Sequence, residues 1–94
     1  MAIYLIGQIR VTDPAAWQLY VERVGATFPP HGGTVLWRGL KVAELCRAAH
    51  GERVVVAQFP SLAALRAWHD SPEYQALVAL REAGAEVVLT AYEG

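Results

Sequence analysis

The 94 residues of this sequence are enough for one small domain, so we expect a single domain over residues 1–94. Hydrophobic residues make up 54% and charged residues only 18%, which is more apolar than usual for a soluble domain. Because so short a chain has a large surface for its volume, this composition predicts self-association. The net charge of −1 and the scattered basic residues argue against nucleic acid or a membrane surface as partner.

The single cysteine, Cys46, has no intramolecular partner, and an unpaired thiol is typical of a reducing compartment. The first residues lack the basic segment of a signal peptide, and their apolar run is too short to cross a membrane. We therefore expect a cytoplasmic protein.

Alternating side chains predict a first strand over residues 2–11. Asp13 can accept hydrogen bonds from the first turn of a helix, and Pro14 suits the first helical position. An apolar stripe at helical spacing follows, and Pro29 and the proline after it should stop this helix near Phe28.

A turn that uses positive φ is predicted at residues 31–33, which hold two glycines. A strand is expected over 34–38, broken by Gly39 and resumed over Lys41–Leu45. Two interpretations stay open here, a bent strand with a bulge at Gly39 or a hairpin of two short strands. The β-branched run within residues 53–59 predicts the next strand.

Ser61 can cap a helix whose inner face would carry Leu62, Leu65 and Trp68. Ser71 can cap a second helical piece that begins at Pro72. We expect this piece to run unbroken to about Gly84, with a last strand over residues 86–92.

The predicted order is β-α-β-β-α-β, the α+β ferredoxin-like pattern, in which one antiparallel sheet carries its helices on one face. The other sheet face should mix apolar and polar side chains. Its predicted members are Tyr4, Ile6, Gln8, Val54, Val56, Gln58, Val88, Thr90 and Tyr92. A patch of this size usually marks an interface, so we expect a homodimer packed through this face. A monomer with an open face and a ligand cavity on this face are the alternatives.

The sequence resembles the bacterial domain of unknown function 1330 (DUF1330) family over nearly its whole length. The resemblance rests on four runs: His31-Gly32-Gly33, Trp37-Arg38-Gly39, Val55-Val56-Ala57-Gln58-Phe59-Pro60-Ser61-Leu62 and Ala67-Trp68-His69-Asp70-Ser71-Pro72-Glu73-Tyr74-Gln75. It implies a dimeric α+β barrel, a superfamily that includes small monooxygenases, muconolactone isomerase-like enzymes and chlorite dismutase-like haem proteins. The family carries no assigned reaction to transfer.

His31 and His69 are the candidate catalytic residues, because histidine can move a proton near neutral pH. His31 could instead bond the backbone of its loop, which is the interpretation we favour. His69 lies about 100° round the helix from Trp68, at the margin of the inner face. It could line a pocket mouth or face solvent.

The candidate ligand-binding residues are Arg38, Trp68, Tyr74 and Trp37. Arg38 could bind a carboxylate bidentately or pair with an acid across the dimer. Trp37, its neighbour on the strand, must face the opposite way. Trp68 is favoured as a core residue, and Tyr74 as a structural tie rather than a hydrogen-bond donor in a pocket.

No phosphate loop, dinucleotide fingerprint or zinc spacing is present, and we expect neither metal nor cofactor. The favoured hypothesis is that the protein binds or acts on a small apolar or aromatic metabolite, in the manner of cofactor-independent monooxygenases. A non-catalytic ligand-binding or structural dimer is the first alternative. A haem-handling protein is the second, and it needs a histidine that faces an apolar cavity.

Overall fold

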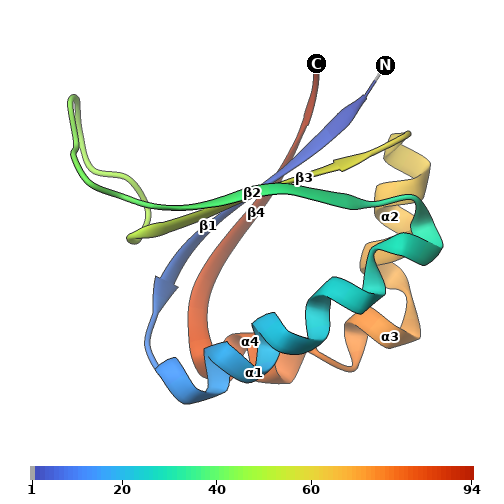
Figure 1. Cartoon of the computed structure of the whole chain (residues 1–94), viewed down its shortest axis with the longest axis horizontal. Helices are drawn as coiled ribbons and strands as arrows, with labels where there is room; N and C mark the ends of the chain where they lie inside the picture. The colour runs from blue at the N-terminus through green and yellow to red at the C-terminus, as the bar shows by residue number, and fades with distance from the viewer. Residues whose placement is uncertain (1) are drawn as a thin grey trace.

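The computed structural model describes residues 2–94 and contains one four-stranded sheet with its helices on one side (Figure 1). In chain order the elements are β1 (Ile3–Val11), α1 (Pro14–Val24), η1 (Gly25–Thr27), η2 (Pro29–His31), β2 (Thr34–Leu40), β3 (Arg53–Phe59), α2 (Leu62–Asp70), α3 (Pro72–Gln75), α4 (Val78–Gly84) and β4 (Ala85–Glu93).

The strands lie in the order β2-β3-β1-β4, and all three pairings are antiparallel. This is the ferredoxin-like arrangement, so the predicted fold class and element order are confirmed. The helix-facing side of the sheet is the core side. Its buried apolar side chains, with those of the helices, are Ile3, Leu5, Ile9, Trp17, Tyr20, Val24, Phe28, Ala57, Phe59, Leu65, Trp68, Tyr74 and Ala85.

The prediction of a strand over Lys41–Leu45 was wrong, and so were both interpretations of Gly39. Strand β2 runs through Gly39 to Leu40, and its irregularity lies earlier, between Val35 and Trp37. The half-exposed ring of Trp37 occupies the space that a Cβ at Gly39 would take, so glycine at this position gives room to the ring. Strand β2 is therefore continuous through Gly39, where the sequence predicted a break, and residues 41–52 form a loop.

This β2–β3 loop extends away from the helices and the core (Figure 1). Its apolar side chains Val42 and Leu45 are 94% and 96% exposed. Its base is fixed all the same, because the Lys41 amide donates to the Glu52 carbonyl at 2.7 Å. On its return side, the ring Nε2 of His50 lies 2.9 Å from the Glu86 carbonyl on β4.

Two helix boundaries also differ from the prediction. Helix α1 ends at Val24, and the chain reaches Pro29 through tighter 3₁₀ turns, because a proline cannot donate the helical hydrogen bond. The second helical piece, expected unbroken, splits into α3 and α4 where ψ at Leu77 opens to −8°. Leu62, predicted on an inner face, is exposed, because it begins α2 at the rim of the sheet.

The predicted caps and turn are confirmed. The Asp13 carboxylate accepts from the amides of Ala15 and Ala16, and the Ser61 hydroxyl accepts from Ala64. Gly32 has φ of +72°, which closes the turn before β2. Among residues 2–94, every helix falls short of the length and apolar character that crossing a membrane requires.

Candidate functional site

The site candidate is an open cleft between α1 and the β2 side of the sheet, with a volume of about 380 Å³. Strand alternation decides which side chains face it. Arg38 pairs with Val55 and Arg53 pairs with the buried Ile9, so both arginines belong to the helix-facing side of the sheet. The full lining is Ile9, Trp17, Gln18, Val21, Arg38, Gly39, Leu40, Arg53 and Val54.

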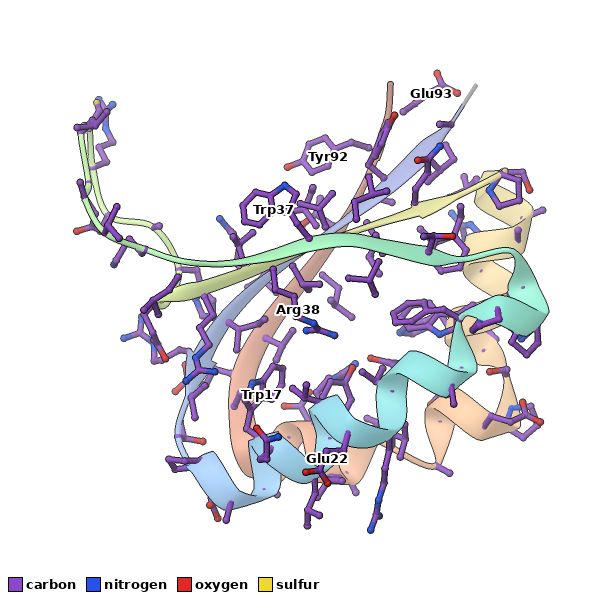
Figure 2. The ribbon with its side chains drawn as sticks, in the orientation of Figure 1. Trp17, Glu22, Trp37, Arg38, Tyr92 and Glu93 are labelled. Atoms are coloured by element: carbon purple, nitrogen blue, oxygen red, sulfur yellow. The ribbon has the colours of Figure 1, made fainter. Side chains whose placement is uncertain are left out.

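A small apolar cavity of about 30 Å³ lies deeper, between the sheet and the helices. Ile9, Trp17 and Arg38 line both this cavity and the open cleft. The Arg38 side chain therefore lies at the boundary between the open cleft and the aromatic core. Figure 2 shows the side chain extending from β2 toward α1 and Trp17.

Arg38 has no partner of opposite charge among the residues that the structure describes. Within residues 2–94, no carboxylate oxygen lies within 4 Å of its guanidinium, and its side chain makes no hydrogen bond there. A guanidinium offers five N–H donors in a planar fork, and these match a carboxylate. Arg38 is thus available to a ligand.

A buried chain of hydroxyls lies behind the cleft. The Tyr20 and Tyr74 hydroxyl oxygens are 2.9 Å apart, and Arg81 donates to the Tyr74 oxygen at 2.9 Å. Burial, with the neighbouring Tyr74, raises the pKa of Tyr20 well above its usual value, while the positive charges of Arg81 and Arg38 oppose this shift. The Tyr20 hydroxyl therefore stays protonated at neutral pH and is not a candidate base.

Arg81 lies at the end of this chain and also donates to the exposed carboxylate of Glu82. Its pKa is raised: burial alone would lower it, but the hydrogen bonds to Glu82 and Tyr74 outweigh that effect. Tyr74 thus connects α1, α3 and α4 through one oxygen atom, which agrees with the structural tie favoured from the sequence.

Trp68 packs at the centre of the core, where it is almost fully buried. Its ring stacks on Phe28 with centroids 4.9 Å apart, and its Nε1 donates to the Thr27 hydroxyl at 2.9 Å. The Thr27 hydroxyl in turn donates to the Val24 carbonyl at 2.6 Å. Trp68 also contributes to the wall of the deep cavity.

The two histidine candidates lie apart from the cleft. His31 ends η2, and His69 lies at the end of α2 with its ring centroid 5.6 Å from that of Tyr74. The Nδ1 of His69 is 3.3 Å from a carboxylate oxygen of Asp70. Neither histidine, nor His50, lines the cleft or the deep cavity. A haem iron in the deep cavity would therefore find no histidine ligand from this chain.

Trp37 lies on the opposite side of the sheet from Arg38, as strand alternation requires, and it points the same way as Tyr92 (Figure 2). Its side chain is 55% exposed. A larger hollow of about 650 Å³ lies between Trp37, Gln8 and the β2–β3 loop. The β2–β3 loop forms most of that hollow, and side chains of both charge signs line it.

The structure thus brings Arg38 and Trp68 to one cavity and adds residues that the sequence did not single out. One of them is Trp17, which is buried on α1. The other is Arg53, the first residue of β3. The available signal was its spacing of two from Val55, which puts it on the face of Arg38. Within the described 93-residue stretch from Ala2, no three His, Cys, Asp or Glu side chains are placed to hold a metal ion.

The model of the domain of unknown function family DUF1330 matches residues 2–94. The chain belongs to this family. No functionally curated protein matches the sequence. Among solved structures, a protein of unknown function from Rhodopseudomonas palustris is 25% identical with a TM-score of 0.84, covering 99% of this chain and 82% of that one.

Two further structures share the fold at lower identity. SnoaB, a cofactor-independent oxygenase from Streptomyces nogalater, is 16% identical with a TM-score of 0.73, covering 99% of this chain and 92% of its own. A dimeric ferredoxin-like protein of unknown function from Jannaschia sp. CCS1 is 16% identical with a TM-score of 0.76, over the full length of both chains. These likenesses agree with the fold of this DUF1330 chain.

Proposed function

We propose that this DUF1330 protein binds a small apolar or aromatic molecule in the cleft between α1 and the sheet. The observation that carries the proposal is Arg38, an unpaired guanidinium at the boundary between the open cleft and the aromatic cavity. Small-molecule sites are mostly apolar concavities with a few placed polar groups. In this proposal Trp17 supplies the apolar wall and Arg38 orients the ligand.

The other predicted site residues then take supporting roles. Trp68 and Tyr74 hold the aromatic core that shapes the inner wall. His31 and His69 remain candidate catalytic residues, and either would need to reach the ligand by a change of conformation or through water. Contact of a base with the reacting proton requires about 3 Å.

An oxygenase of the cofactor-independent kind is the second candidate function, and the likeness to SnoaB favours it. In such a reaction dioxygen is the oxidant: one oxygen atom converts a substrate CH₂ group to a carbonyl, and the other leaves as water with the two hydrogens. Oxygen uptake with anthrone as probe tests it. A rate equal to that of buffer alone, in the presence of a bound probe, leaves binding as the function.

We also propose that the protein is a homodimer packed through the open sheet face, in the cytoplasm as the unpaired Cys46 indicates. Exposed Trp37 and Tyr92 lie on that face, with Ile6, Val54 and Val56 between them. The dimeric Jannaschia neighbour supports this arrangement. Sedimentation that gives only a monomer at micromolar concentration would contradict it.

The cleft is tested by binding of the neutral fluorescent probe N-phenyl-1-naphthylamine to the whole protein. Val21 lines the cleft, so Val21→Trp should fill it and weaken binding about tenfold or more. Leu19→Trp on the same helix is the control, because Leu19 lines neither cavity and should leave affinity unchanged. Gln18→Trp, at the exposed rim, repeats the test should Val21→Trp fold poorly. Equal affinity of the wild type and the three tryptophan variants for the probe would refute the proposed site.

A further inference from the structure

We propose that the ligand of the cleft is an aromatic molecule with a carboxylate or similar anionic group, and that Arg38 and Arg53 hold this group together. The inference rests on the proposed binding function and adds the ligand class and a second binding residue. It is carried by the placement of two guanidiniums on one wall of an apolar cleft that no carboxylate lines.

Strand register brings the two arginines close. Arg38 is paired with Val55 and Leu40 with Arg53, so Arg38 and Arg53 are diagonal neighbours on β2 and β3. Diagonal neighbours on one face of an antiparallel pair lie about 7–8 Å apart. Both side chains are long and exposed and both line the cleft, so their forks can converge on one anion.

The acidic residues near the cleft accept hydrogen bonds from groups other than the two arginines. The Glu52 carboxylate accepts from the Val11 amide at 3.1 Å, and that hydrogen bond is the main cause of its lowered pKa. On α1, the Glu22 carboxylate accepts from the Gln18 side chain at 3.4 Å. Within residues 2–94 the salt bridges of the other basic side chains are Arg10–Glu86, Lys41–Glu44, His69–Asp70 and Arg81–Glu82. Within residues 2–94 neither Arg38 nor Arg53 forms a salt bridge, and Arg38 has no carboxylate beside it. Arg53 lies close enough to Glu52 that its charge helps to lower the pKa of that carboxyl, so Glu52 balances part of the Arg53 charge.

The floor of the cleft selects the rest of the ligand. Ile9, Trp17 and Val21 present an apolar and aromatic surface beside the arginines. A volume of about 380 Å³ suits a molecule of one to three rings. The hollow beside the β2–β3 loop shares Arg53 with the cleft, but Glu44 and Glu52 also line it and Arg38 does not. An anion on an aromatic frame therefore fits the cleft better than the hollow, because two arginines and no carboxylate of residues 2–94 line the cleft.

The test compares two probes that share one aromatic frame. 8-Anilinonaphthalene-1-sulfonate carries an anionic group, and N-phenyl-1-naphthylamine is the same frame without it. In Arg38→Gln and in Arg53→Gln, binding of the sulfonate should weaken about tenfold while binding of the neutral probe changes less than about twofold. Arg66→Gln is the matched control, because Arg66 is exposed on α2 and lines neither cavity.

Two further measurements define the ligand class. 1-Naphthoate should displace the sulfonate probe from the wild-type protein, and the double variant should lose this competition. Added salt should weaken sulfonate binding to the wild type more than to the double variant, because screening acts on the two arginine charges. Circular dichroism and thermal unfolding verify that each variant is folded.

The outcomes separate the two proposals. If the neutral probe binds in a manner sensitive to Val21→Trp, but the sulfonate ignores both arginine variants or responds equally to Arg66→Gln, the anion inference is wrong and the cleft remains a binding site. If Val21→Trp and Gln18→Trp leave binding of both probes unchanged, the cleft is no site and both proposals are wrong.

Discussion

Replacing Tyr74 with phenylalanine removes one oxygen atom that serves two buried partners. The hydroxyl of Tyr20, a residue that is 7% exposed, lies 2.9 Å from this oxygen, and Arg81 donates to it at 2.9 Å. A net hydrogen bond contributes about 1 kcal/mol, and a buried group left unpaired costs about 1–3 kcal/mol. Arg81 retains Glu82 at 2.7 Å, so we expect a total loss of about 2–3 kcal/mol in the free energy of unfolding.

For a domain of this size that loss corresponds to a fall in Tm of roughly 10–20 °C. Tyr20→Phe leaves the Arg81–Tyr74 bond in place and should cost about 1 kcal/mol. In the double variant the two losses should not add, because each single variant already removes the same Tyr20–Tyr74 hydrogen bond. The double-mutant cycle should therefore give an interaction energy of about 1 kcal/mol between Tyr20 and Tyr74. Denaturant unfolding at one fixed protein concentration measures all four proteins, since a dimer's stability depends on concentration. Additive effects, or equal losses in the two single variants, would refute the reasoning.

Three other changes have defined outcomes. Gly84→Ala places a Cβ 2.6 Å from a backbone nitrogen of α1 and should destabilise the fold by about 1–3 kcal/mol. Gly25→Ala meets no atom within 4 Å and should be neutral or stabilising. Thermal unfolding of both variants and the wild type tests this, and equal Tm values for the two variants would contradict it. The lowered pKa of Glu52 means that its contribution is present above its ordinary value of 4.5 and is lost as pH falls through the lower folded value. The stability difference between the wild type and Glu52→Gln should therefore shrink below about pH 4.5, and an unchanged difference there would contradict the hydrogen bond. Trp37→Glu should convert the proposed dimer to monomer in sedimentation, whereas Leu19→Glu on α1 should not; a Trp37→Glu dimer would rule out the sheet-face interface.

The fold could be predicted because its signals are local. Asp13, Ser61 and Ser71 each mark a helix start, and the caps they make need no partner from elsewhere in the chain. Gly39 misled the prediction because a glycine inside a strand usually marks a break. Here it gives room to the ring of Trp37, two residues away on the same face, and a single sequence does not reveal that contact.

The site was only partly predictable, because its members come together through register and not through spacing. Trp37 and Arg38 were correctly assigned to opposite faces, since alternation is a local rule. Spacing alone could place Arg53 on the same face as Val55. That Arg53 neighbours Arg38 depends on the pairing of β2 with β3 across a long loop, and spacing does not predict that pairing. Tyr74 and Tyr20 are 54 residues apart, and their hydroxyl contact depends on how α1 packs beside α3 and α4.

The reversal at Ser71 limits where the chain can change its length. Its hydroxyl donates to the Trp68 carbonyl at 2.7 Å and accepts from the Tyr74 amide at 3.2 Å, so one side chain ends α2 and begins α3. No spare residue lies between the two helices, and an insertion there would separate Trp68 from Tyr74 in the core. The β2–β3 loop, by contrast, keeps residues 41–49 exposed and should accept an added peptide at small cost. An epitope tag or a fused reporter therefore belongs in that loop and not at the helical reversal.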